Sequence, residues 1–243
     1  MVRSSIFICI LFPTMVLAGP NENHFFLGLS AGPTWATGNK NQTFNLQPDV
    51  IKTYQAKNDS SIFPSAELFL GRQRWVCISP TLPLVAQFGL EFAAAGQAKL
   101  HGDIWEDADP TFDNYTYHYK INHTHVGLKV RFVGRSDYLI NPYFNAMIGA
   151  GFNHAYDFTI NPKIPEEVAA PAFKSKTMNA FSYALGAGLQ MTLNAKWQAA
   201  VGYEFADWGR VQLGRAPGQT VNQGLQLDHL YAHQLQFSLF YSV

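Results

Sequence analysis

Apolar and polar residues alternate with a period of two along most of the chain. In the last run, HQLQFSLFYSV, the apolar positions are Leu235, Phe237, Leu239, Tyr241 and Val243, and the polar ones are Gln234, Gln236 and Ser238. Such alternation predicts a β-strand with one apolar face. The last residues of soluble proteins usually fray, so a strand that stays apolar on one face to its end needs a surface to cover that face.

Seven earlier runs alternate in the same way. They are FFLGLSAGPTW from Phe25, IFPSAELFLG from Ile62, LVAQFGLEFA from Leu84, VGLKVRF from Val126, YFNAMIGAGF from Tyr143, FSYALGAGLQM from Phe181 and WQAAVGYEF from Trp197. A tilted β-strand needs about 9–11 residues to cross a membrane. Eight runs of about this length predict an all-β fold, a single eight-stranded antiparallel up-and-down transmembrane barrel.

The chemistry of the two faces decides which one meets lipid. One face of nearly every run is apolar and aromatic, while the other mixes Gly, Ala, Ser, Gln, Asn and isolated charges. Eight strands enclose an interior just wide enough for side chains to fill, and large apolar residues from every strand would overfill it. We therefore expect the apolar face to lie outside, which argues against a lipocalin-like soluble barrel.

The connections between the runs are unequal in length. Long polar segments, expected to be loops, run over 35–61, 95–115, 153–178 and 208–229, whereas VGRSD and TLNAK are tight turns and RQRWVCISPT is intermediate. Short periplasmic turns and long extracellular loops are the outer-membrane pattern. In the turn TLNAK we expect Met191 to pair with Trp197, which places Gly186 opposite Gly202 in the lumen.

One stretch departs from the common phase. Tyr115, Tyr117 and Tyr119 alternate out of phase with the run that starts at Val126. A β-bulge near 123–125 would reconcile the two halves. We then expect the tyrosines to form an aromatic rim where this strand leaves the membrane, because Tyr and Trp favour interfaces.

The first residues and the composition indicate export. Arg3, an apolar core over 6–17 and the small residues before Ala18 predict a cleaved signal peptide over 1–18, followed by one barrel domain over 19–243. Removing Arg3 leaves 16 Lys+Arg against 17 Asp+Glu, a net charge of 16 − 17 = −1. That balance gives no electrostatic footprint for nucleic acid. Of the two cysteines only Cys77 would remain, so no internal disulfide is expected.

With these features the chain resembles the small eight-stranded outer-membrane β-barrel proteins of Gram-negative bacteria, the group that includes the OmpA transmembrane domain and OmpW. The sharpest element of the resemblance is the alternation from Leu235 to Tyr241, with Val243 where this group usually ends on Phe. The resemblance implies residence in the outer membrane, contact with its lipids and lipopolysaccharide, and a C-terminal signal for the barrel-assembly machinery formed by Leu235, Phe237, Leu239, Tyr241 and Val243. It also implies surface-exposed loops that could hold a host or surface ligand.

Five charged residues fall on predicted lumen positions: Glu67, Glu91, Lys129, Arg131 and Glu204. Buried charges persist when they are paired and hydrogen-bonded, so these residues predict either a structural network or an ion gate. His123-x-His125 would put two imidazoles on one face, as a metal site requires, but no Cys or carboxylate set completes a ligand shell. We expect no metal and no cofactor.

The chain carries no motif that would make it an enzyme. Two eight-stranded barrel enzymes act on lipid A, and one family of them uses a His-x-Ser pair, which none of the eight histidines here forms. The one G-x-S-x-G match, GLSAG over 28–32, lies within an alternating run and is not expected to form a nucleophile elbow, and H-E-x-x-H and phosphate-loop motifs are missing from the sequence. The sequence therefore favours a non-enzymatic barrel with a closed or nearly closed polar lumen and exposed loops. The alternatives are a small passive pore and a lipid A-modifying enzyme.

Overall fold

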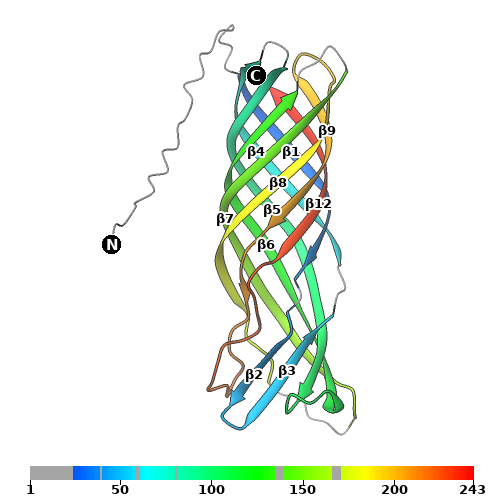
Figure 1. The fold of residues 1–243 in the computed structure, drawn as a ribbon, viewed down its shortest axis with the longest axis vertical. Helices are drawn as coiled ribbons and strands as arrows, with labels where there is room; N and C mark the ends of the chain where they lie inside the picture. The colour runs from blue at the N-terminus through cyan, green and yellow to red at the C-terminus, as the bar shows by residue number, and fades with distance from the viewer. Residues whose placement is uncertain (1–23, 39, 58–60, 80–81, 135–138, 166–170) are drawn as a thin grey trace, which may run out of the picture.

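Eight long strands close into a barrel. The computed structural model describes residues 24–243 apart from 39, 58–60, 80–81, 135–138 and 166–170, so the predicted signal peptide lies outside the described residues. The barrel strands are β1 (His24–Thr37), β4 (Ile62–Ser79), β5 (Leu82–Glu106), β6 (Asp113–Gly134), β7 (Ile140–Pro162), β8 (Lys176–Thr192), β9 (Trp197–Asp207) and β12 (Tyr231–Ser242). Each pairs antiparallel with the next, and β1 pairs with β12, which closes the ring (Figure 1). The predicted eight-stranded antiparallel barrel is confirmed.

The two ends of the barrel differ. At the turn end, where the C-terminus lies, short connections join β4 to β5, β6 to β7 and β8 to β9. At the opposite loop end, β5, β6 and β7 extend far beyond the other strands, and a hairpin of β2 (Gln42–Gln47) and β3 (Val50–Ala56) pairs along the extension of β5 (Figure 1). A 3-10 turn, η1 (Pro110–Phe112), and a short pair of β10 (Val211–Gln212) with β11 (Gln226–Leu227) complete this end. Three predicted loops, 35–61, 95–115 and 153–178, therefore contain long stretches of strand.

An apolar band surrounds the turn-end half of the barrel. Every barrel strand exposes large apolar side chains there, among them Leu29, Leu70, Leu90, Leu128, Ile148, Leu185, Val201 and Leu239. Phe181 is 68% exposed and Leu128 is 61% exposed. Leaving this much apolar surface in water would cost about 25 cal/mol for each Å², so the band faces hydrocarbon. Among the described residues, no helix is both long and apolar enough to cross a membrane.

Strand β6 keeps one phase from Tyr115 to Val133. Its odd-numbered residues over this range all point inward, and its even-numbered residues point outward. Within this range the register shifts lie in its neighbours, between Ala95 and Ala98 of β5 and opposite the step from His118 to Lys120, where Asp157 of β7 has a positive φ of 56°. A further shift lies at the start of β6, where Asn114 is the extra residue. The bulge predicted near 123–125 is wrong, because what changes along β6 is the chemistry of each face.

Polarity inverts at the loop end. Outward positions on β6 change from Val126, Leu128 and Val130 to Thr124, His118 and other polar residues, whereas inward positions become aromatic. Tyr115, Tyr117 and Tyr119 are 2%, 3% and 6% exposed, so they form no interfacial rim. They belong instead to an apolar core inside the extension, together with Tyr54, Phe158, Phe173, Leu100 and Ile104.

The register of β8 and β9 differs from the prediction by two residues. The Asn194 side chain accepts hydrogen bonds from the N–H groups of Lys196 and Trp197, and the N–H of Leu193 donates to the carbonyl of Trp197. This tighter turn pairs Met191 with Ala199, so Gly202 lies opposite Gly188, and Gly186 lies opposite Glu204. Gly186 and Gly202 both face the lumen, but they are not opposite each other.

Candidate functional site: the barrel lumen

Lumen glycines lie opposite the long charged side chains. Gly89 is paired with Lys129, Gly127 with Glu91 and Gly186 with Glu204. Two of these glycines also approach a second backbone closely: a Cβ on Gly89 would lie 1.9 Å from the carbonyl oxygen of Leu70. The missing side chains let neighbouring strands come together and leave room for the charged residues to cross the lumen.

One ammonium group joins three carboxylates in the middle of the barrel. Nζ of Lys129 on β6 lies 2.7 Å from Oε1 of Glu67, 2.8 Å from Oε2 of Glu91 and 3.1 Å from Oε2 of Glu204. These carboxylates come from β4, β5 and β9, so the cluster connects four strands of the ring. All four side chains are at most 7% exposed. The ammonium donates hydrogen bonds to Glu67 and Glu204, and Glu91 is held as an ion pair.

The neutral amide of Gln236 completes the cluster. The amide nitrogen of Gln236 donates to Oε2 of Glu67 at 3.0 Å and to Oε1 of Glu204 at 3.3 Å. Three carboxylate ligand atoms of Glu67, Glu91 and Glu204 lie within 4.8 Å of one another, a spacing that a metal ion could use. The Lys129 ammonium already occupies the cation position between them, so the set is complete as an ion-pair network.

A chain of hydrogen bonds leads from the cluster toward the loop end. Nε2 of His125 lies 2.6 Å from Oε1 of Glu91, Nδ1 of His125 lies 2.9 Å from Nε2 of His123, and Nδ1 of His123 lies 2.7 Å from Oδ1 of Asn153. The amide nitrogen of Asn153 donates to the carbonyl oxygens of Trp208 and Arg210. His123 also stacks on the Trp208 ring at 4.2 Å. All four imidazole nitrogens therefore have partners, and the pair offers no open ligand to a metal.

The hydrogen-bond partners along this chain require one proton beyond those of two neutral imidazoles and an ionised Glu91. Because the nitrogen of Asn153 donates to two carbonyls, its oxygen must accept from Nδ1–H of His123. Nε2 of His123 then accepts from Nδ1–H of His125, since a neutral imidazole has one donor and one acceptor. The remaining contact between His125 and Glu91 needs a proton of its own. With that proton, the formal charge of the cluster is 1 + 1 − 3 = −1.

Arg131 lies apart from this cluster, nearer the turn end. Its guanidinium carbon is 3.9 Å from the ring centre of Tyr143 and 4.4 Å from that of Phe240. Nη1 donates to the side-chain oxygens of Gln87 and Gln190. Of the five charged residues expected in the lumen, the structure thus brings three carboxylates together around Lys129 and places the fifth residue, Arg131, in a layer of its own.

Sequence reasoning missed several lumen residues. His123 and His125 are in phase with Lys129 at two-residue steps, but the assumed bulge broke that series. The signal that could have found them is the unbroken alternation of β6. Three further histidines, His101, His118 and His154, lie outside the lumen series on the extension, where His101 is opposite His118 and His154 bonds Thr177.

Comparisons with known proteins give matches among solved structures. No family model and no curated protein sequence matches the chain. Among solved structures, Neisserial surface protein A (NspA) is 10% identical, with 89% of this chain and 96% of that chain covered and a TM-score of 0.45. OprG from Pseudomonas aeruginosa is 11% identical, with 90% and 96% covered and a TM-score of 0.48. The outer membrane protease OmpT from Escherichia coli is 8% identical, with 94% and 99% covered and a TM-score of 0.49.

The class of the protein follows from its own strands. A closed antiparallel ring leaves no barrel edge unpaired, as lipid requires, and the exposed apolar band lies on every barrel strand. Short turns at one end and long connections at the other complete the pattern of these barrels. The chain is an eight-stranded transmembrane β-barrel of the outer-membrane type.

Replacing Lys129 tests the cluster. Lys129→Met should lower the free energy of unfolding in detergent by about 3–5 kcal/mol at neutral pH, because three buried carboxylates lose the ammonium that lies between them. Urea unfolding measures this loss. Lys40→Met is the matched control, since it breaks an exposed pair with Asp228 and should cost about 1 kcal/mol or less.

The pH dependence of the stability lost in Lys129→Met distinguishes the effect of the ammonium charge from the effect of side-chain packing. Protonated carboxyl groups do not need the ammonium, so the penalty of Lys129→Met should shrink as the pH is lowered. An equal penalty at every pH at which both proteins fold would show that Lys129 acts only by filling space.

Proposed function

We propose that this protein is a closed, non-enzymatic outer-membrane barrel that carries a folded surface outside the cell. The observation that carries the proposal is a lumen filled in successive layers. Arg131 with Tyr143 and Phe240, then the Lys129 cluster, then the His123–His125 pair occupy the turn-end half. The aromatic core of the extension follows. Such filling supports a structural role for the charged network and argues against a gate.

The loop end has the construction of a small soluble domain. Its inward side chains are apolar, its outward ones are polar, and ion pairs connect its elements. Asp103 on β5 binds Lys57 at 2.9 Å and Lys163 at 2.9 Å, and Lys163 also binds Asp113 at 2.6 Å. Burial alone would raise the pKa of Asp103, but these two ammonium groups hold it below its usual range.

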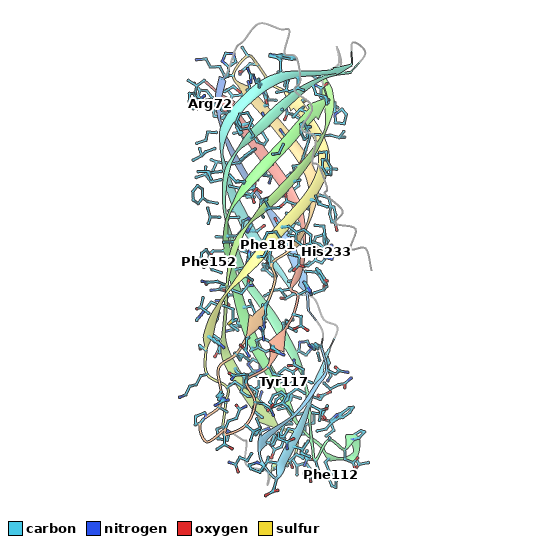
Figure 2. The ribbon with its side chains drawn as sticks, turned by 60° about the vertical axis from the view of Figure 1, so that its left-hand side comes forward. Arg72, Phe112, Tyr117, Phe152, Phe181 and His233 are labelled. Atoms are coloured by element: carbon cyan, nitrogen blue, oxygen red, sulfur yellow. The ribbon has the colours of Figure 1, made fainter. Side chains whose placement is uncertain are left out.

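The tip of this extension is the part farthest from the membrane. Phe112 lies there and is 49% exposed (Figure 2). Asp109 fixes the tip by accepting hydrogen bonds from the backbone and the hydroxyl group of Thr111. A rigid extension with a fixed tip is suited to holding one surface toward the exterior, where a host or surface ligand would meet it. Its immediate partners at the membrane would be outer-membrane lipids and lipopolysaccharide.

Conductance in planar bilayers tests the closed lumen. The folded protein, identified by its altered gel mobility before boiling, should insert without producing current steps, because each lumen layer blocks ion passage. A boiled sample of the same preparation controls for contaminating pores. Reproducible open-channel currents that require the folded protein would contradict the proposal and favour the small passive pore.

We also propose that the end of β12 acts as an assembly signal. Leu235, Phe237 and Leu239 are exposed on the lipid side, and the Tyr241 ring packs 4.9 Å from that of Trp197. The strand is held to its end, since the N–H of Val243 donates to the carbonyl of Phe25. An exposed alternating face at the closing strand is a surface that assembly machinery could bind before the ring closes.

Truncation tests this second proposal. Deleting Tyr241 to Val243 should leave the protein unfolded in the periplasm and open to proteases, while Val243→Phe should assemble at least as well as the original chain. The measurement is the amount of heat-modifiable protein extracted from the outer membrane. Full assembly of the truncated chain would refute the assembly role.

A further inference from the structure

The turn end contains an open cavity of about 350 Å³. Most of its described lining is polar and neutral, including Gln73, Gln87, Gln190 and Gln198, with Arg74 and Trp75 beside them. No Asp or Glu lies among the described residues that line it. Ligand pockets have volumes of about 300–1,000 Å³, so the space could hold a small polar molecule.

A buried cation lies directly behind the cavity. Arg131 is 1% exposed, and its described contacts are the Gln87 and Gln190 amides and the rings of Tyr143 and Phe240. None of these contacting groups is a carboxylate that would neutralise the guanidinium charge. Nη2 of Arg131 has no hydrogen-bond acceptor among the described residues. Glu67 of the neighbouring Lys129 layer attracts the guanidinium electrostatically, but no ion pair joins Arg131 to a carboxylate among the described residues, so the guanidinium can still act on an anion in the cavity.

Two chains of hydrogen-bonded glutamine side chains connect Arg131 to the cavity. A guanidinium can only donate, so the side-chain oxygens of Gln87 and Gln190 must face it. Their nitrogens therefore donate onward, from Gln87 to the oxygen of Gln73 at 3.3 Å and from Gln190 to the oxygen of Gln198 at 3.0 Å. This leaves the N–H groups of Gln73 and Gln198 as the ends of the two chains.

The four amides consequently share one orientation. Each carbonyl oxygen is turned toward Arg131, and each nitrogen is turned away from it, so the positive ends of the amide dipoles point along the chains toward Gln73 and Gln198. Hydrogen bonds in such a chain polarise one another. A cavity lined by the donor ends of two chains that start at a cation attracts negative charge and repels metal cations.

We propose that this cavity binds a small polar molecule through an oxyanion, a carboxylate or a phosphate group. The oxyanion would accept hydrogen bonds from Gln73 and Gln198 and lie near Arg74, and the positive charge of Arg131 would attract it. The ring layer of Tyr143 and Phe240 closes the cavity toward the middle of the barrel, so the site is a blind pocket open at the turn end. This site is independent of any ligand at the loop end.

Binding is measured on the full-length protein folded in detergent, at constant ionic strength. The probes are inorganic phosphate and acetate, with neutral acetamide as the control, and the signal is tryptophan fluorescence, to which Trp75 in the cavity wall contributes. We expect saturable binding of at least one anion and none of acetamide. Tighter binding of phosphate would assign the site to phosphate-bearing ligands, and tighter binding of acetate to carboxylates.

Variants tie the signal to the proposed groups. Arg131→Met should weaken anion binding at least tenfold, and so should the double variant Gln73→Leu, Gln198→Leu, which keeps Arg131 and its rings in place. Arg72→Gln is the matched control: it removes a positive charge from the same end of the barrel, but Arg72 lies on the outer side over Phe25 (Figure 2). The affinity of this control variant for the anions should be unchanged.

Three results would overturn the proposal. They are no saturable signal with either anion, binding of acetamide as tight as that of the better-bound anion, and unchanged affinity in the folded double variant. Gel mobility before and after boiling shows which variants are folded, and the double variant still decides the question if Arg131→Met does not fold.

Discussion

The narrow interior of an eight-stranded ring must be filled by side chains, and the rest of this structure depends on that constraint. Lipid surrounds the ring, so the polar groups have to lie inside, where space is short. The solution here is one ammonium among three carboxylates. Lys129 contacts residues of β4, β5 and β9, and lumen glycines opposite Glu91, Lys129 and Glu204 supply the room. Either kind of charge alone would be uncompensated in the lumen, so cation, carboxylates and glycines form one unit.

The same ring of strands lies in lipid at one end and in water at the other. In the turn-end half the outside is apolar and the lumen is polar, whereas in the extension the outside is polar and the lumen is aromatic. Strand β6 crosses both regions without a change of phase, and the exchange of chemistry occurs close to His123 and His125. These histidines lie where the polar lumen meets the apolar core, and their hydrogen-bond chain gives every buried ring nitrogen a partner. The barrel wall is thus continuous from the membrane into the exterior surface that we propose it presents.

Period-two alternation was sufficient to predict the eight strands, the lipid-facing side and the lumen positions of the charged residues. It failed where the polarity inverts. On β6 the apolar residue Tyr117 points inward and the apolar residue Leu128 points outward, so the pattern indicates a change of phase if apolar residues are assumed to mark a single face. The inferred bulge then hid His123 and His125 from the lumen series. The register of β8 and β9 was wrong for a local reason, the closure of the turn by the Asn194 side chain. The grouping of Glu67, Glu91 and Glu204 around Lys129 depends on how the ring closes, which single-strand patterns do not contain.

The most direct test of this account is a cysteine scan along β6, in a background in which Cys9 and Cys77 are replaced by Ser. Each folded variant carries a spin label, and its collision rates with oxygen dissolved in the lipid and with a water-soluble relaxation agent are compared. Labels at Leu128→Cys and Val130→Cys should meet lipid, those at Thr124→Cys and His118→Cys should meet water, and Ile121→Cys should be reached by neither. Lipid contact at His118→Cys, or a surface-accessible Ile121→Cys in a folded barrel, would contradict the single-phase strand with inverted polarity.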